Sequence, residues 1–300
     1  MSVAAVFVNV LLFLLLAPLF EGVMRRITAR VQSRQGPPLV QPYFDLLKLL
    51  GKDRVDSARN WAFRLAPPAA FASILAVAAL VPLGSKVNAL GARVDAVTIV
   101  YLLTLGGVAV LLGALASRNT FAAIGASRET VTMVMVEPVL AMTLLVGAAR
   151  GRSLGLGAAV FGGSAAGYGL STAVMLAAYA VALQAFAAKQ PFDIPEAEIE
   201  VLEGAFIEYS GPDYALFRYY VMMKRMVYAW LFAAVFLPFL RTGTYAGDIL
   251  TQLLGTLAVF ALVALVGSTN PRLRIDQAVK VYAGLIVVAL TAVGLAVAGL

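Results

Sequence analysis

The sequence contains no cysteine and no histidine, and only 13% of its 300 residues are charged. Without these two residue types the chain offers no disulfide, no thiolate chemistry, no iron–sulfur ligation and none of the usual zinc sites. What it has instead is apolar surface, with 61% hydrophobic residues and a mean hydropathy of +0.89. Soluble domains do not have this composition, which is typical of a multi-pass membrane protein.

Eight apolar segments each approach the ~20 residues that a helix needs to cross a bilayer. We therefore expect one all-α integral membrane domain over residues 1–300, with eight transmembrane helices. The Gly-rich residues 153–168 are either an extension of the fifth span or a loop. The expected spans are 4–20, 67–83, 96–116, 131–149, 169–188, 220–240, 249–268 and 279–299.

The basic residues are distributed unevenly between the two sides of this topology. The odd-numbered loops, with the basic pair at the start of the sixth span, contain 18 of the Lys and Arg residues, and the even-numbered loops contain 5. Because cytoplasmic loops are enriched in Lys and Arg, we expect both termini on the outer side and the loops 21–66 and 189–219 in the cytoplasm. The net charge of +7 then reflects sidedness, and nucleic-acid binding is not expected.

The first of these loops contains a short amphipathic pattern. In QPYFDLLKLLGK, residues 41–52, apolar side chains recur at i, i+3, i+4 and i+7 from Tyr43. Pro42 suits a first helical turn and Gly51 a helix end. The segment is too short to span a bilayer, so we expect a helix that lies along the interface or against neighbouring helices.

The loop 189–219 concentrates acid that the rest of the chain lacks. Asp193 and Pro195 predict a helix N-terminus, and Gly211-Pro212 predicts its end. Two interpretations remain open: a solvated acidic face, or glutamates that raise one another's pKa and so hold protons or cations. Seven of the sixteen carboxylates lie here, namely Asp193, Glu196, Glu198, Glu200, Glu203, Glu208 and Asp213.

Glu137 is a carboxylate inside the fourth span, directly before Pro138. An ionised carboxylate at this depth costs about 2.5 to 3.5 kcal/mol on insertion scales. It is therefore either a protonated side chain in one interhelical hydrogen bond or part of a proton relay or gate. Lys224 and Arg225 begin the sixth span, where they either snorkel to the interface or pair with loop carboxylates such as Asp193 and Asp213.

Three long motifs give the chain a family resemblance. Over essentially its whole length it resembles the membrane-anchor subunit shared by respiratory complex I, where it is subunit 1, and by energy-converting membrane-bound [NiFe] hydrogenases of the formate hydrogenlyase type. The motifs are EGVMRRITARVQSRQGPPLVQPYFDLLKLLGKD, PFDIPEAEIEVLEGAFIEYSGPDYALF and PRLRIDQAV.

One departure favours the hydrogenase branch. Complex I subunits typically carry an Arg-x-Gly-Pro-Asn-Arg-Val-Gly-Pro run after the first span, which helps to build the quinone chamber. Here RQGPP, residues 34–38, continues directly into LVQP. The shorter form resembles the hydrogenase-type subunit and argues against a quinone site.

The resemblance implies a multi-pass subunit of the cytoplasmic membrane, without catalytic residues or cofactors of its own. It would join a peripheral redox arm, made of hydrogenase large and small subunits with iron–sulfur clusters and a [NiFe] centre, to antiporter-like membrane subunits within the lipid bilayer. The implied ion-pathway residues are Glu137, Glu196, Glu198, Glu200, Glu203 and Glu208. The implied partner contacts are Arg25, Arg26, Arg30 and Arg34.

The leading hypothesis is a non-catalytic subunit that links ferredoxin oxidation and proton reduction on partner subunits to H⁺ or Na⁺ translocation. Its alternatives are the membrane-anchor subunit of complex I (NADH-quinone oxidoreductase) lining a quinone site, a sulfur-reducing relative of the hydrogenase complex, and a passive anchor. A stand-alone cation/proton antiporter is a further alternative, and it predicts inverted repeats with interrupted helices. The Glu137-Pro138 element occurs once, without a counterpart in a second half.

Overall fold

The computed structural model describes residues 3–55, 57–58, 60–165, 169–195 and 198–300, in which all regular structure is helical apart from two isolated β-bridges. The α-helices are α1 (Val3–Val31), α2 (Gln41–Leu50), α3 (Trp61–Leu80), α4 (Ala96–Ala116), α5 (Thr120–Gly151), α6 (Leu156–Ala165), α7 (Leu170–Phe186), α8 (Glu198–Val201), α9 (Gly211–Phe236), α10 (Tyr245–Thr269) and α11 (Ile275–Val297).

The predicted all-α membrane domain with about eight spanning helices is confirmed. Six helices are long and apolar enough to cross a membrane, namely α1, α3, α4, α5, α10 and α11. The apolar helix α7 has 17 residues, and α9 has 26 residues with two adjacent basic side chains in its middle. Several bounds differ from the prediction, because α1 continues to Val31, α5 begins at Thr120 and α9 begins at Gly211. Residues 156–165 form the separate helix α6.

The centre of the bundle is α9. Every side chain from Met222 to Phe236 is buried except Lys224, which is partly exposed. The helix packs against α1, α3, α7 and α10. A helix that is apolar nearly all round belongs inside a protein, so the two basic residues on α9 lie in the interior of the bundle.

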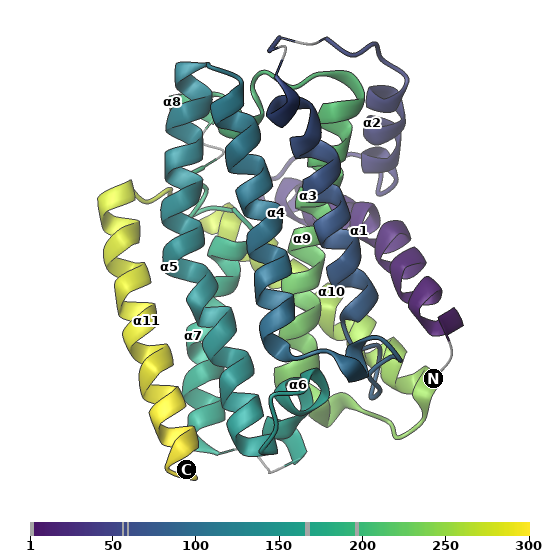
Figure 1. Cartoon of the computed structure of the whole chain (residues 1–300), viewed down its shortest axis with the longest axis vertical. Coiled ribbons are helices and arrows are strands. Elements are labelled where there is room, and N and C mark those ends of the chain that lie inside the picture. Colours follow the sequence, from purple (N-terminus) through teal and green to yellow (C-terminus); the bar gives the residue numbers. More distant parts are fainter. Residues whose placement is uncertain (1–2, 56, 59, 166–168, 196–197) are drawn as a thin grey trace.

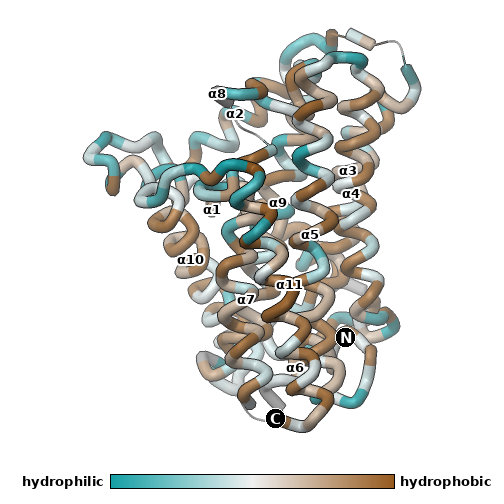
Figure 2. The backbone as a smooth tube through the Cα atoms, turned by 90° about the vertical axis from the view of Figure 1, so that its left-hand side faces the viewer, coloured by the Kyte–Doolittle hydropathy of each residue, from teal (hydrophilic) through white to brown (hydrophobic). Residues whose placement is uncertain are grey.

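The two ends of the molecule differ in what they hold (Figure 1). The helices α2 and α8 lie at one end, and both chain termini lie toward the other. The arrangement agrees with the predicted alternation of loops, and the assignment of one end to the cytoplasm stays a prediction. Figure 2 shows α10 leaning away from the remaining bundle at the end that holds α2, and α1 packs against α10.

The interfacial helix is confirmed as α2, with Pro42 in its first turn and Gly51 at its C-cap. The chain between α1 and α2 folds back onto α1. A Cβ atom at Gly22 would lie 2.1 Å from the carbonyl oxygen of Leu39, so only glycine permits this approach. The turn therefore holds the basic end of α1 beside α2.

Candidate functional site

Glu137 lies midway along α5 and is only 8% exposed. The hydroxyl of Thr104 on α4 donates a hydrogen bond of 2.7 Å to its Oε2 atom. Its Oε1 atom is buried and has no hydrogen-bond partner within the described part of the chain. The carboxyl group therefore keeps one oxygen available inside the bundle, where a bare polar atom is costly.

A polar stripe on α9 faces this carboxyl group. Tyr220, Lys224 and Tyr228 recur at i, i+4 and i+8, and so lie on one face of the helix. Lys224 and Tyr228 are both within electrostatic range of Glu137. The hydroxyls of Tyr220 and Tyr228 are buried without a hydrogen-bond partner among the described residues. Such groups can bind water or a cation, so the stripe and Glu137 form a polar region in an apolar bundle.

Lys224 extends this region toward the end of the molecule that holds α8. Its ammonium lies 3.2 Å from the carboxylate of Glu129 on α5. A cavity of about 30 Å³ adjoins the pair and is lined by Glu129, Lys224, Tyr220 and Glu203, among others. This volume has room for about two water molecules. The cavity thus connects the acidic segment after α7 with the ion pair inside the bundle.

The acidic segment itself does not form the predicted helix from Asp193 to Tyr209. Its regular structure in the described residues consists of α8 and a 3-10 turn, Gly204–Phe206. Between them Leu202 has φ 59° and Gly204 has φ 55°, both left-handed, which ends the helix. Glu200 and Glu203 therefore do not share a helix face.

Docking against α5 explains the break. A Cβ atom at Gly125 on α5 would lie 2.5 Å from the Cα atom of Gly204, so the two backbones meet where both residues are glycine. Tyr209 fixes the far end of the segment, because its ring stacks on Phe63 at 4.2 Å between centroids. Burial, with the Asp213 carboxylate acting in the same direction, raises the pKa of Tyr209 well above its usual range.

Three of the predicted pathway carboxylates are held by neighbouring helices. Glu200 binds Arg128 at 2.5 Å, and Glu208 accepts a hydrogen bond of 2.5 Å from the amide of Asn119. Glu203 accepts a hydrogen bond of 2.8 Å from Tyr214 and lines the small cavity. Of the three, Glu203 is therefore the carboxylate that the structure brings to the inner polar region.

Two other predicted carboxylates lie at the limit of what the structure describes. Glu196 lies outside the described residues, and so does its predicted capping interaction with Asp193. Glu198 begins α8, but its side chain lies outside the described part. Their predicted roles stay predictions.

The four possible charge partners have contacts that the sequence did not indicate. Arg225 binds Glu21 of α1 through both carboxylate oxygens, at 3.2 and 3.1 Å. Asp193 pairs with Arg272 at 2.6 Å, and Asp213 pairs with Arg54 at 2.8 Å. Lys224 pairs with Glu129, as described above. Sequence reasoning missed Glu21 as an interior carboxylate because it took the first span to end at residue 20.

The predicted partner contacts lie at the end of α1 and just beyond it. Arg26, Arg30 and Arg34 are exposed, whereas Arg25 is partly buried and lies 3.0 Å from Asp45 of α2. Arg25, Arg26 and Arg30 are helical residues, which corrects the prediction that they lie in a loop. The exposed guanidinium groups are available to a partner.

The sequence also offered a signal for the tyrosines on α9. Their spacing of four residues around Lys224 places all three side chains on one helix face, which could have been read from the sequence. The partners of that face, on α4 and α5, could not have been, because nothing in the local pattern indicates which helix it meets.

An all-helical bundle with ionisable groups inside it and an acidic segment at one end defines a multi-pass membrane protein built to hold charge within the bilayer. The chain belongs to the NADH dehydrogenase family, of the type that serves as membrane anchor in complex I, and the family model matches residues 3–298. The resemblance found in its motifs is thereby confirmed.

Relatives place the chain near hydrogenase subunits. It is 35% identical to hydrogenase-4 component C of Escherichia coli, over 88% of this chain and 86% of that protein. It is 34% identical to formate hydrogenlyase subunit 4 of the same organism, over 92% of each chain. A chain in the solved structure of a membrane-bound sulfane sulfur reductase, an archaeal respiratory membrane complex, matches with a TM-score of 0.85 and 27% identity, over 97% of this chain and 99% of that chain. These relatives are components of multisubunit membrane complexes.

Proposed function

We propose that this chain is the membrane subunit of an energy-converting hydrogenase complex of the hydrogenase-4 or formate hydrogenlyase type. It links a peripheral arm that oxidises ferredoxin and reduces protons to the translocation of H⁺ or Na⁺ across the cytoplasmic membrane. The relatives at 35% and 34% identity support the hydrogenase branch. Because the chain has no cysteine and no histidine, the iron–sulfur clusters and the [NiFe] centre are assigned to the partner large and small subunits.

One observation carries the ion-translocating role. Buried Glu137 lies within electrostatic range of Lys224, which binds Glu129, and the small cavity joins this pair to Glu203. Carboxylate, ammonium and tyrosine hydroxyl groups can each accept or donate a proton, and carboxylates bind cations as well. An ion entering from the acidic segment therefore meets a series of polar groups that ends midway through α5.

The test neutralises Glu137 in the assembled complex. We expect Glu137→Gln to keep the shape of the side chain and to lower the number of ions moved per H₂ formed by at least about tenfold, as for loss of a proton-transfer group. Ion movement and H₂ are measured together in sealed vesicles. Asp95→Asn is the matched control, because Asp95 is an exposed carboxylate at the opposite end. An unchanged ratio in Glu137→Gln would show that this residue carries no ions.

A sulfur-reducing complex is the second candidate, favoured by the TM-score of 0.85 to the sulfane sulfur reductase chain. The polar path in this chain would serve either reaction, since the redox chemistry lies in partner subunits. Identification of the subunits that copurify after mild detergent extraction separates the two. A large subunit with cysteine ligands for nickel supports the hydrogenase, and one without them supports the sulfur reductase.

A further inference from the structure

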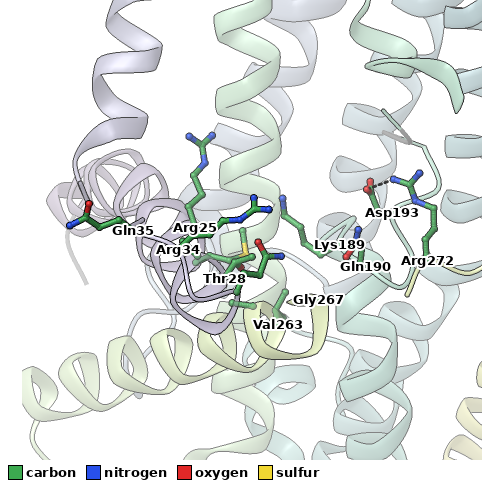
Figure 3. A pocket seen from close by; sticks show the side chains of 14 residues that line it. Arg25, Thr28, Arg34, Gln35, Lys189, Gln190, Asp193, Val263, Gly267 and Arg272 are labelled. Atoms are coloured by element: carbon green, nitrogen blue, oxygen red, sulfur yellow. Dashed lines mark hydrogen bonds and ion pairs between the residues drawn. The ribbon is translucent and has the colours of Figure 1, made fainter. Parts of the chain in front are cut away.

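A second, larger cavity of about 510 Å³ lies apart from the path to Glu137. Its walls come from the C-terminal part of α1, the C-terminal part of α10, the segment after α7 and the residue Arg272 (Figure 3). Four of its lining side chains are basic and one is acidic: Arg25, Arg34, Lys189, Arg272 and Asp193. Its size falls in the range of ~300–1,000 Å³ that is usual for sites enclosing a small molecule.

The basic side chains are held in place by the fold. Arg272 is fixed by its ion pair with Asp193, drawn as a dashed line in Figure 3. Arg34 follows a turn in which Ser33 has φ 58°, and this turn returns the chain toward α1. A Cβ atom at Gly36 would lie 3.1 Å from the Cβ atom of Ala29, so the turn rests directly on the helix. The positive charge of the cavity is thus built into the ends of elements that pack together.

The same cavity has an apolar side that continues onto the lipid-facing surface. Met24 of α1 and Val263 and Ala264 of α10 line it. Beside them on α10, Leu262 is 59% exposed and Val266 is 40% exposed. In a membrane-spanning helix, exposed apolar side chains of this kind face acyl chains. A ligand that fits both sides has an anionic head and a hydrocarbon tail.

We propose that this cavity binds the phosphodiester headgroup of an anionic phospholipid, with its acyl chains against α10. Arg34 and Lys189 supply the charge-assisted contacts to the phosphate, and Arg25 and Arg272 add to the positive field. Basic pockets between transmembrane helices at the cytoplasmic side are suited to such headgroups. The bound lipid bridges α1, α10 and the chain that leads into the acidic segment. Of the four predicted partner contacts, Arg25 and Arg34 therefore line the lipid site, which Arg26 and Arg30 do not.

The experiment measures lipid binding to the purified, delipidated complex. Phosphatidylglycerol and phosphatidylcholine with a fluorescent acyl chain are titrated into it. We expect phosphatidylglycerol to bind more tightly, and Arg34→Gln/Lys189→Gln to weaken it by about tenfold or more. The matched control is Lys86→Gln/Arg93→Gln, which removes two exposed basic residues at the opposite end and leaves binding unchanged. Thermal unfolding without lipid checks that the double variant folds, and exposed Arg34→Gln alone replaces it otherwise.

Several outcomes would overturn the proposal. Equal affinity for the two lipids, or wild-type affinity in the double variant, removes the anionic headgroup site. Competition by inorganic phosphate at the same concentration as the lipid makes it a site for free anions instead. A photo-cross-linker at Thr28, which lines the cavity, distinguishes the last case. Cross-linking to a partner subunit, with phosphatidylglycerol excluded, would assign the cavity to an acidic protein segment.

Discussion

At the scale of single residues, the pair of Arg225 and Glu21 is the most enclosed ionic contact inside the bundle. Their side chains are only 5% and 3% exposed. Arg225 also donates a hydrogen bond of 2.7 Å from Nε to the carbonyl oxygen of Ala187, at the end of α7. One guanidinium group thus joins α1, α7 and α9. Charges this far from water persist only when their partners satisfy them.

Arg225→Met is expected to destabilise the chain by about 3–5 kcal/mol, because it leaves the Glu21 carboxylate buried without its partner. The double variant Glu21→Met/Arg225→Met removes both charges and is expected to recover most of this loss. Thermal unfolding of the purified complex in detergent measures both variants. If the single variant is as stable as the double variant, the pair does not satisfy a buried charge.

The sequence could identify Glu137 but not the partner of Arg225. A carboxylate inside an apolar run is visible in the sequence because the cost of burying it is a property of the residue and its neighbours. Glu21 and Arg225 are 204 positions apart, and their contact depends on how α1 and α9 pack. The same holds for Lys224 and Glu129, 95 positions apart.

At the scale of elements, local signals predicted α2 correctly and the acidic helix wrongly. For α2 the apolar spacing, Pro42 and Gly51 all agree, and nothing in the packing opposes them. In the acidic segment the spacing of glutamates suggested a helix, but Gly204 permits a left-handed residue where the segment meets Gly125 of α5. Tertiary contact decided the conformation there, and helical periodicity carries no information about it.

The docking of α2 is expected to depend on pH through Asp45. Partial burial opposes ionisation, but hydrogen bonds from Gln41 and Arg25 outweigh it, so the pKa of Asp45 lies below its ordinary value. Because this pKa is depressed in the folded state, Asp45 supports docking at pH above its ordinary value of 3.8. The contribution is lost as the pH falls through the depressed pKa. It is small, because Asp45 is 42% exposed.

Hydrogen exchange of the α2 amides, corrected for intrinsic rates, measures this dependence between neutral pH and about pH 3, below the usual Asp pKa. We expect protection in the wild type to fall at the acid end. Asp45→Asn is expected to show slightly lower protection at neutral pH and a weaker fall on acidification. Asp53→Asn removes an exposed carboxylate at the same end and is the control. Identical profiles for all three proteins would exclude a role for Asp45.

At the scale of the whole molecule, the number of spans followed from the sequence and their packing did not. A bilayer requires apolar segments of a minimum length, and each such segment is visible in the composition. Faces that meet lipid and faces that meet protein are both apolar, so hydropathy does not show that α9 is central or that α1 packs against α10. The charge distribution does predict orientation, since it is a property of the loops alone.

Orientation can be tested directly, because the chain has no cysteine and every introduced thiol is unique. Ser57 lies between α2 and α3 at one end, and exposed Ser153 lies between α5 and α6 at the other. The excess of basic residues in the odd-numbered loops predicts that Ser153→Cys reacts with a membrane-impermeant maleimide in spheroplasts. Ser57→Cys is expected to react only in inverted vesicles stripped of peripheral subunits. The reverse pattern would place the acidic segment outside the cell, away from any cytoplasmic redox arm, and would exclude the proposed entry of ions beside Glu203.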